Sequence, residues 1–582
     1  MTREDPTASR SLAGNDASRT DAREKTRGTA RYPTDLERPD MLHGGVLRAQ
    51  QPHAEITAVR TGDAEAIDGV AAVITREDLP DGFDTRIRHY GDAIAAVAGE
   101  TEEAVSAALE AIEYDSDRLE STHDPRHSVR DGSPVVHREP EYGHPERHPR
   151  NVENSEYVQN VDDYHRLEVG DVASGFEAAD HVFEEEYRTS RVNHCNLDRH
   201  CCLAEWEEGT LRVTETIGNP PSAKRTLERL FPGSEVEIEL PPESGSSFGG
   251  RSLVTLTLEP IAATLAREAG RPVRVAFDRE EEFTSADSRH ATVVEIKAGL
   301  TGEGRLTALS VDVVADTGPY PNGVGHIVLN AFENRPLDLY ALENYRFEGV
   351  SAFTNNIPAG EYRGIGVTQL TWALVSHLDE LARRAGVDPI EFQRRNWVEE
   401  GYERPHTGTP VTSCGLRECL ERGRETFREI RTATEPDTES VVTGSGMGVG
   451  AQTTTPASEH NTDYTEATLE LAPDGSLLVR TGAVELGQGA ETVLGQIAAD
   501  RLGVALERVT IVEHEPGSGV EDKYGSVANR TTYFMGRAVI EAADTLTRTL
   551  RERGSEYFDV PADAVTIAGG TLEAPDGQEI GL

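Results

Sequence analysis

Loops rich in glycine and small polar residues carry the clearest chemical signal in this 582-residue sequence. The segment ESGSSFGGRS (243–252) lies between a strand-like stretch, EVEIELP, and an apolar helix expected to begin near Leu253. A glycine-rich loop ahead of a helix presents backbone N–H groups to an anion, and the helix dipole strengthens that preference. Glycine-rich turns are also common, so this loop alone does not identify a ligand.

Three further segments have the same character. GAVELGQGAETVLGQIAADRLGV (482–504) places Gln488 between two glycines, so an amide that donates and accepts hydrogen bonds stands where the backbone can approach a ligand. GSVANRTTYFMGRAVIEAA (525–543) offers hydroxyl and N–H groups to a phosphate or a pterin. PAGEYRGIGVTQL (358–370) carries Arg363, which can hold an anionic or oxo group or form a surface salt bridge.

Mixed α/β elements are expected to position these loops. Periodicity predicts strands at 41–49, 69–75 and 92–100, a helix at 101–114, and a hairpin at 464–482 that turns at Asp474-Gly475. Between 164 and 400 the pattern predicts strands in DHVFEEEYRTS and GTLRVTETI, and amphipathic helices in PIAATLAREAG and TQLTWALVSHLDELARRAG. The last helix should end at Gly386. Residues 121–163 and 428–440 have the composition of linkers.

Composition excludes several classes of protein. The net charge is −46, the acids are spread along the chain, and only four lysines occur: Lys25, Lys224, Lys297 and Lys523. Such a surface favours a halophilic host and argues against binding to nucleic acid. No apolar run is long enough to span a membrane, and the polar N-terminus resembles neither a signal nor an anchor, so a cytoplasmic protein is expected.

The cysteines and the acid run have plain structural interpretations. Five cysteines without a CxxC pair place any iron–sulfur cluster on another polypeptide. The spacing of His194, Cys195, His200, Cys201 and Cys202 fits no standard zinc pattern, which favours framework over metal binding. DREEEF (278–283) is expected to be a solvated face rather than a catalytic carboxylate pair.

The loops, taken in order, resemble the xanthine dehydrogenase/aldehyde oxidase family. ESGSSFGGRS is similar to the family's GGxFGG loop, EYRGIGVTQ to its YRGFGxPQ loop, and VELGQGAETVLGQIAAD to its ELGQGxxTxxxQIAA signature. GSVANRT is similar to the pterin-binding stretch that follows. RTDAREKTRGTARYPTDLERPDMLHGGVLRA, YGDAIAAVAGETEEAV, GDVASGFEAADHVFEEEYRT and NHCNLDRHCCLAEW also match, so the resemblance covers residues 19 to 582.

This resemblance implies an α+β chain. A disordered tail (1–18) precedes an α/β hammerhead domain (19–125), a linker (126–163), a first elongated molybdenum-cofactor-binding domain (164–400) and a second, incomplete one (401–582). It implies a molybdenum hydroxylase subunit that binds molybdopterin, often as the cytosine dinucleotide. Such a subunit oxidises an aldehyde or N-heterocycle with water as oxygen source, and passes electrons to iron–sulfur and FAD subunits.

Site residues follow from the same resemblance. Phe248 and Gly249 match the loop beside the metal, Arg363 matches the arginine near metal and substrate, and Gln488 with Gly489 matches the pterin contact. None of them is expected to coordinate the metal directly. The stretch that matches the family's dinucleotide-binding segment contains Val527, Ala528, Asn529 and Thr531.

Departures from the family pattern limit what the resemblance implies. Gly218 stands where the family has a glutamine, with Asn219 one position away, and Ser252 stands where purine-oxidising members have a glutamate. EYRGIG lacks the cysteine of the carbon monoxide-oxidising branch, so that activity is set aside.

No residue matches the family's C-terminal catalytic glutamate, since Glu579-Ile580-Gly581 is not its motif. The expectation is a C-terminally truncated subunit. Either a separate polypeptide completes it, or the chain is a catalytically decayed scaffold. The nearest replacement bases are Glu243 and Glu361.

Overall fold

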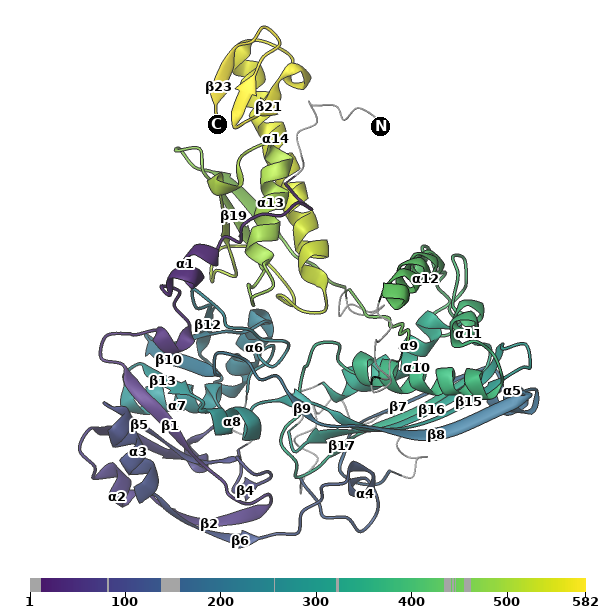
Figure 1. Ribbon diagram of the computed structural model, residues 1–582. Helices are drawn as coiled ribbons and strands as arrows, with labels where there is room; N and C mark the ends of the chain where they lie inside the picture. Colours follow the sequence, from purple (N-terminus) through teal and green to yellow (C-terminus); the bar gives the residue numbers. More distant parts are fainter. Residues whose placement is uncertain are drawn as a thin grey trace. The chain divides into compact units, whose positions relative to one another are not determined.

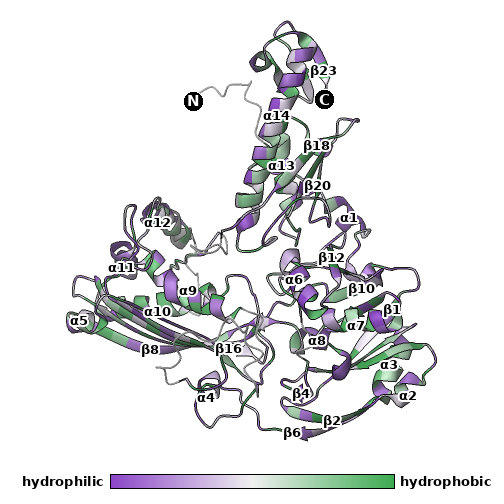
Figure 2. Cartoon of the chain, turned by 180° about the vertical axis from the view of Figure 1, so that it is seen from behind, coloured by the Kyte–Doolittle hydropathy of each residue, from purple (hydrophilic) through white to green (hydrophobic). Residues whose placement is uncertain are grey.

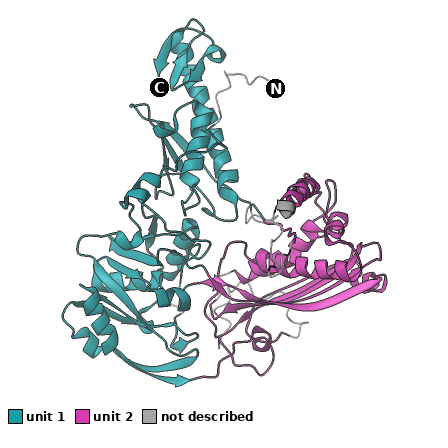
Figure 3. Ribbon diagram, in the orientation of Figure 1, with its two compact units in different colours: residues 1–118, 194–286, 453–582 teal, residues 119–193, 287–452 magenta. Residues whose placement is uncertain are grey.

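The computed structural model describes residues 12–80, 83–137, 157–255, 257–320, 324–433, 441, 444, 446–454 and 462–582. The chain divides into two compact units (Figure 3), each described here by itself. Unit 1 comprises residues 1–118, 194–286 and 453–582, and unit 2 comprises residues 119–193 and 287–452. Residues 194–286, inside the domain predicted over 164–400, pair with N-terminal strands in unit 1, whereas the rest of that range lies in unit 2.

A seven-stranded sheet forms the largest layer of unit 1 (Figure 1). Its strands, in order across the sheet, are β12 (Glu235–Glu239), β11 (Thr210–Glu215), β10 (Cys201–Glu207), β13 (Val273–Ala276), β1 (Leu42–Arg48), β5 (Ala93–Gly99) and β3 (Val70–Thr75). Strand β1 runs parallel to β13 and antiparallel to β5. The three N-terminal strands confirm the predictions at 41–49, 69–75 and 92–100.

Helices cover both faces of this sheet, which explains why every residue of β5 is buried. Helix α7 (Glu259–Ala269) shares a core with Ala96 and Ala98, whereas helix α3 (Glu102–Ala111) shares a core with Ile94 and Val97. Figure 2 shows green, hydrophobic stretches on α7 and on the strands. The remaining elements of this part are α1 (Ala22–Arg27), α2 (Gly62–Glu65), α6 (Pro220–Leu230), α8 (Arg279–Thr284), and a sheet of β4 (Arg86–Ile87), β2 (Ala54–Arg60) and β6 (Glu113–Arg118).

Residues 462–582 form another α/β layer of unit 1. The sheet contains β18 (Ala467–Leu471), β19 (Leu477–Thr481) and β20 (Val509–Val512), and packs against α13 (Ala490–Leu502) and α14 (Gly536–Phe558). The hairpin predicted at Asp474-Gly475 is confirmed, since Gly475 adopts a φ of 79° between β18 and β19. A small sheet of β21 (Thr566–Ala568), β22 (Thr571–Glu573) and β23 (Glu579–Gly581) follows.

The segment before α1 is ordered from residue 12 onward. Leu12 and Ala13 donate their N–H groups to the carboxylate of Asp500, at 2.5 and 2.8 Å, and Gln496 donates its side-chain amide to the carbonyl of Leu12 at 2.7 Å. The prediction of a disordered tail over 1–18 is therefore wrong for residues 12–18, because bonds to helix α13 offset the cost of ordering them; residues 1–11 lie outside the described residues.

Unit 2 is built on a five-stranded sheet with the order β7 (Val161–Val169), β17 (Tyr345–Phe353), β16 (Leu306–Gly318), β15 (Ala291–Leu300) and β8 (His181–Thr189). Helices α9 (Gly325–Leu339) and α10 (Val367–Arg384) pack on this sheet through a core that includes Val311, Phe332 and Leu378 (Figure 1). Gly386 follows α10 with a φ of 72°, as predicted for its C-terminal end.

Shorter elements complete unit 2. They are α4 (Pro125–Ser128), α5 (Val172–Glu177), α11 (Pro389–Asn396), α12 (Leu416–Ala433), and a two-stranded ribbon of β9 (Val192–Asn193) and β14 (Ser288–Arg289). The linker predicted at 428–440 begins inside α12, and its residues 434–440 lie outside the described residues, as do residues 138–156 of the linker predicted at 126–163. Among the described helices, none combines the length and the apolar character needed to cross a bilayer.

Candidate functional site

Three of the four predicted loops meet at Gly218, in the turn between β11 and α6. Gly218 donates its N–H to the carbonyl of Arg251 at 2.7 Å, and its own carbonyl accepts from the N–H of Ser526 at 2.9 Å. A Cβ placed on Gly218 would lie 3.3 Å from Leu486 and 3.5 Å from the hydroxyl of Ser252. Segments 243–252, 482–489 and 525–531 are thus brought together within unit 1.

The loop 243–252 has a strained backbone. Ser246, Phe248 and Gly249 have φ values of 131°, 51° and 107°, and the Phe248 ring is 47% exposed. Left-handed conformations in residues other than glycine cost about 1–3 kcal/mol each and persist where surrounding contacts enforce them. Here Arg251 supplies such contacts, because its buried guanidinium pairs with Asp198 at 2.8 Å and donates to the carbonyls of Ser246 and Asp198.

The Gln488 loop is held in shape by a carboxylate that the motif did not reveal. Glu485 accepts hydrogen bonds from the N–H groups of Gly487 and Gly489, each at 2.8 Å, and from Glu491 at 3.2 Å. The Gln488 side chain is exposed and folds back on its own loop, donating to the carbonyl of Val484 and accepting from Leu486. Gly487 has open space around it, and Gly489 begins α13.

The stretch 525–531 is fixed by a buried arginine. Ala528 and Asn529 have φ values of 45° and 59°, and a π-helical turn (Thr531–Met535) follows before α14. Arg530, 0% exposed, pairs with Asp463 at 2.7 Å and Asp522 at 2.9 Å, and donates to the carbonyl of Gly525 at 2.7 Å. Left-handed Asn529 followed by right-handed Arg530 places successive N–H groups as anion-binding turns do.

Hydroxyl groups join this stretch to the Gln488 loop. Val484 donates its N–H to the hydroxyl of Ser526 at 2.9 Å, and the hydroxyl of Thr531 donates to Ser526 at 3.2 Å. The carbonyl of Val527 accepts from the N–H of Arg530 at 3.0 Å, so Val527 lies in the same tight turn. The predicted pterin-side and dinucleotide-side residues therefore belong to one bonded assembly.

The N-terminal segment adds cations that sequence reasoning missed. Arg19 pairs with Glu485 at 3.3 Å and donates to the carbonyl of Gly487 at 2.9 Å. Lys25 pairs with Glu243 at 2.8 Å. These two cations link segment 12–27 to both the 243–252 loop and the Gln488 loop. The sequence offered one signal for these contacts: lysine is rare, with only four in the chain, and Lys25 is one of them.

Arg363 belongs to unit 2 and is described there. Its side chain is exposed, and its carbonyl accepts a hydrogen bond from Arg289 at 2.8 Å, while the Arg289 guanidinium stacks 4.1 Å from the centre of the Tyr362 ring. Gly364 and Gly366, with φ values of 75° and 71°, complete the turn into α10. The loop around Arg363 is thus rigid, with its guanidinium directed to the surface of the unit.

Asn219 and the histidine–cysteine segment have structural roles. Asn219 caps α6, since its side-chain oxygen accepts the N–H of Ser222 at 3.1 Å, so the expected replacement for the family glutamine is engaged in a helix cap. His200 lies between Glu282 and the carbonyl of Gly250, 3.0 Å from each. In the described part of the chain, no group of three histidine, cysteine or acidic side chains could hold a metal ion.

The prediction for the acid run needs correction. DREEEF is not simply a solvated face, because Glu282 is 2% exposed and accepts hydrogen bonds from His200. Glu281 is also engaged, pairing with Arg48 at 2.8 Å. The segment forms α8, and Glu282 supports the 243–252 loop through His200, which contacts the carbonyl of Gly250.

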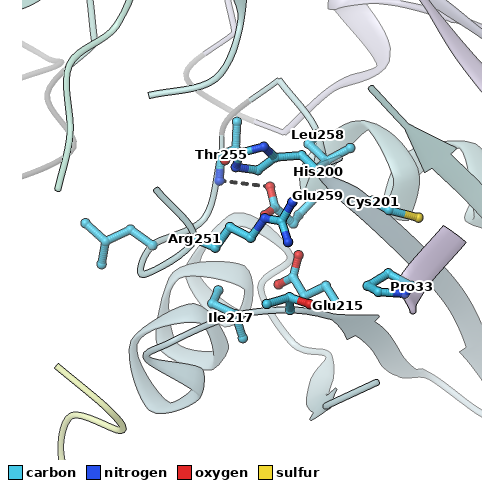
Figure 4. Close-up of a pocket in the computed structure, with 11 residues that line it drawn as sticks. Pro33, His200, Cys201, Glu215, Ile217, Arg251, Thr255, Leu258 and Glu259 are labelled. Carbon is cyan, nitrogen blue, oxygen red and sulfur yellow. Dashed lines mark hydrogen bonds between the residues drawn. The ribbon is translucent and has the colours of Figure 1, made fainter. Parts of the chain in front are cut away.

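A buried cavity beside the Phe248 loop contains two more carboxyl groups (Figure 4). Glu215 ends β11 and Glu259 begins α7, and each is 3% exposed. Their carboxyl groups and the Arg251 side chain point toward the same space, and Glu259 accepts the N–H of Thr255 at 2.8 Å. Burial raises the pKa of Glu215 and of Glu259, and their mutual interaction raises that of Glu259 further.

Comparison with known proteins agrees with this architecture. Residues 27–120 match the model "Aldehyde oxidase and xanthine dehydrogenase, a/b hammerhead domain", and residues 152–397 and 420–580 match two models described as "Molybdopterin cofactor-binding domain". The fold is that of solved molybdenum hydroxylases. The structure of quinoline 2-oxidoreductase from Pseudomonas putida 86 covers 97% of this chain, with 74% of its own chain matched, at 23% identity and a TM-score of 0.81.

Curated relatives identify the family. A probable xanthine dehydrogenase subunit from Bacillus subtilis is 33% identical over 94% of this chain and 72% of its own length. The nicotinate dehydrogenase large molybdopterin subunit of Eubacterium barkeri is 31% identical over 72% of this chain and 97% of its own length. The chain therefore belongs to the xanthine dehydrogenase/aldehyde oxidase family of molybdopterin-dependent oxidoreductases, as a molybdopterin-binding subunit.

Proposed function

We propose that the three loops around Gly218 hold the molybdenum–pterin cofactor of a hydroxylase. Their convergence through the two backbone hydrogen bonds of Gly218 is the observation that carries the proposal. The loops fit such a group, because a phosphate-bearing pterin needs clustered N–H donors and close backbone approach. Phe248 in the 243–252 loop and Asn529 in the 525–531 stretch have left-handed backbone, and Gly487 in the Gln488 loop has open space around it.

Each predicted residue then has a role. Phe248 and Gly249 would lie on the metal side, and Gln488 with Gly489 would contact the pterin. By the family resemblance alone, Arg363 is proposed to act near the metal and the substrate. The dinucleotide side, with cytosine as the proposed base, would be held by Val527, Ala528, Asn529 and Thr531. When bound, the molybdenum would supply the two-electron redox chemistry by which oxygen from water reaches the substrate, and the loops would orient the group.

The substrate is proposed to be an aldehyde or an N-heterocycle other than a purine. Ser252 takes the place of the glutamate expected in purine-oxidising members. Ser252 is 4% exposed, and its hydroxyl lies beside the Gly218 turn. A neutral, small side chain there cannot form the charged contact that a glutamate would give. Electrons would leave to iron–sulfur and FAD subunits, since the five cysteines contain no CxxC pair.

The catalytic base is proposed to come from a separate polypeptide that carries the family's glutamate. Glu243, one of the two nearest alternatives, is 8% exposed and its carboxylate is already engaged by Lys25 at 2.8 Å. A positioned base contributes on the order of a hundred- to ten-thousand-fold to the rate. We also propose a halophilic host, which the acidic, lysine-poor composition supports, and a cytoplasmic location.

The decisive experiment measures molybdenum and released pterin nucleotide in protein purified from a host that makes the cofactor. Near-stoichiometric metal is expected in the wild type. Gln488→Ala should lower the affinity roughly five- to thirtyfold, because one or two hydrogen bonds of about 1 kcal/mol each are lost. Gln578→Ala is the matched control, since that amide also folds back on its own exposed loop, donating to Asp576 at 2.6 Å. Folded protein without metal or pterin would refute the proposal.

Turnover tests the source of the base. The 582-residue chain with its cofactor should oxidise aldehydes and N-heterocycles very slowly with an artificial electron acceptor. Addition of a polypeptide carrying the family's glutamate segment should restore the rate. No rescue by any such segment would support the decayed scaffold instead. A fast rate from the chain alone that Glu243→Gln or Glu361→Gln abolishes would assign the base to that residue.

A further inference from the structure

Glu215 and Glu259 form a carboxyl pair that the cofactor loops do not account for. They come from different elements, the end of β11 and the start of α7, and both are almost fully buried. Both residues line the same cavity, and their carboxyl groups point into it (Figure 4). Oε1 of Glu215 accepts no hydrogen bond from the part of the chain that the structure describes.

His200 and Arg251 favour the ionised form of Glu215, but burial outweighs them and raises its pKa. Arg251 is committed to Asp198 at 2.8 Å, and His200 is committed to Glu282 and to the carbonyl of Gly250. Two buried carboxylates that face one cavity repel each other, so one proton stays with the pair at neutral pH. The other titratable groups facing it are the thiols of Cys201 and Cys202, whose pKa values burial raises.

Both carboxyl groups are connected to the Phe248 loop. Glu259 accepts the N–H of Thr255 at 2.8 Å, which anchors the segment that follows the loop. Glu215 stands three residues before Gly218, whose N–H donates to the carbonyl of Arg251 at 2.7 Å. A shared proton between the two carboxyls therefore joins the loop to the turn on which the other cofactor loops converge.

We infer that Glu215 and Glu259 are positioning residues that share one proton and thereby hold residues 246–255 against the Gly218 turn. Only the consequence rests on the proposed function: the cofactor should be held more weakly when the proton is lost. The proton leaves to solvent hydroxide, after which two adjacent carboxylates push β11 and the start of α7 apart. Loop closure is thus favoured in acid and lost in alkali.

The direction with pH follows from proton linkage. A carboxyl whose pKa is raised on folding binds more protons in the folded state than in the unfolded state above its ordinary pKa. The free energy of unfolding therefore falls as pH rises from the ordinary carboxyl range through the raised pKa values of the pair. Glu215→Gln replaces the shared proton by an amide N–H that can donate to Glu259 at any pH, so it should mimic the protonated pair.

The test is hydrogen exchange of residues 246–255 followed by mass spectrometry on the full chain, from about pH 6 to about pH 9, corrected for intrinsic exchange. In the wild type, exchange of this segment should rise roughly tenfold or more with pH, whereas in Glu215→Gln it should stay flat. Glu259→Gln is the second variant, and Glu268→Gln, on the exposed end of α7, is the control. An infrared band of a neutral carboxyl at neutral pH should disappear in either pair variant.

The hydrogen-exchange and infrared measurements test the shared proton separately from the proposed cofactor binding. Exchange and infrared bands do not depend on bound molybdenum, so protein that lacks the metal can still support the shared proton. Wild-type exchange that is independent of pH, or pair variants that follow the wild type, would overturn the inference. If Glu215→Gln fails to fold, a flat exchange profile in Glu259→Gln supports the inference and a rising one contradicts it.

Discussion

Arg530→Met should destabilise unit 1 more than any surface substitution, because it leaves two buried carboxylates without a counter-ion. Arg530 is 0% exposed, and the side chains of its partners Asp463 and Asp522 are 1% and 2% exposed. Removing one member of such a buried network costs about 3–5 kcal/mol. Unit 1 has roughly 340 residues, so an unfolding entropy of about 2.1 cal/mol/K per residue converts this loss into a fall in melting temperature of roughly 4–7 °C.

The assay is thermal and urea unfolding, followed by circular dichroism, with molybdenum content measured on the same preparations. Arg537→Met is the matched control, since Arg537 lies on the same helix, is 78% exposed, and pairs with Glu541 at 3.3 Å. That exposed pair should be worth about 0–1 kcal/mol. Molybdenum content should fall only in Arg530→Met, because the carbonyl of Gly525 loses its donor and the 525–531 turn is released.

A rescue experiment separates charge from volume. Combining Arg530→Met with Asp463→Asn and Asp522→Asn removes both orphaned charges and should recover part of the lost stability. The reasoning is refuted if Arg530→Met differs from Arg537→Met by less than about 1 kcal/mol. It is also refuted if the triple variant is less stable than the single one.

Three other predictions concern the glycine contact, a histidine and the surface charge. Gly525→Ala should lower the free energy of unfolding by several kcal/mol and weaken cofactor retention, because the new Cβ would lie 2.3 Å from the carbonyl of Gly218. The control Gly519→Ala, at φ 75° with nothing within 4 Å, should lose only about 1–2 kcal/mol. Equal losses in unfolding titrations would contradict this. Burial alone would lower the pKa of His165, but its ion pair with Asp163 at 3.8 Å and its hydrogen bond to Glu333 at 2.9 Å outweigh burial and raise the pKa to about 9. The stabilisation, up to about 3 kcal/mol, should be complete below the unfolded-state pKa and lost as pH rises through about 9; a wild-type advantage over His165→Gln that does not shrink over this window would contradict the assignment. The net charge of −46 predicts a melting temperature that rises from low salt to multimolar KCl, and a flat response would disprove the halophilic interpretation.

The positions of the loops could be predicted from the sequence because their signals are local. Glycine spacing around Gln488 and the strand-to-helix change near Phe248 are visible within about twenty residues, the scale on which periodicity acts. The start of α7 was expected near Leu253 but lies at Glu259, since the intervening residues are tied to the Gly218 turn and to the carboxyl of Glu259.

Long-range pairing accounts for what the sequence did not reveal. Strand β1 pairs with β13, so residues 194–286 fold with the N-terminal strands in unit 1, although the segments before and after them in the sequence belong to unit 2. The partners of Arg530 lie on segments before and after β18–β20, and an isolated arginine in a turn carries no mark of burial. Glu215 lies on the same face of β11 as Leu211 and Val213, and α7 packs on that face, so the acid is buried although the strand alternates as predicted.

The scattered origin of unit 1 sets an order of events during synthesis. Strand β1 is made early but cannot find β13 until residue 273 has been translated, and the segment at Leu12 cannot dock until Asp500 exists. At about 5–20 residues per second, these partners appear after waits on the order of tens of seconds. The nascent N-terminal strands must be shielded from aggregation over that time, and the proposed cofactor loops are complete only after residue 531 has been translated.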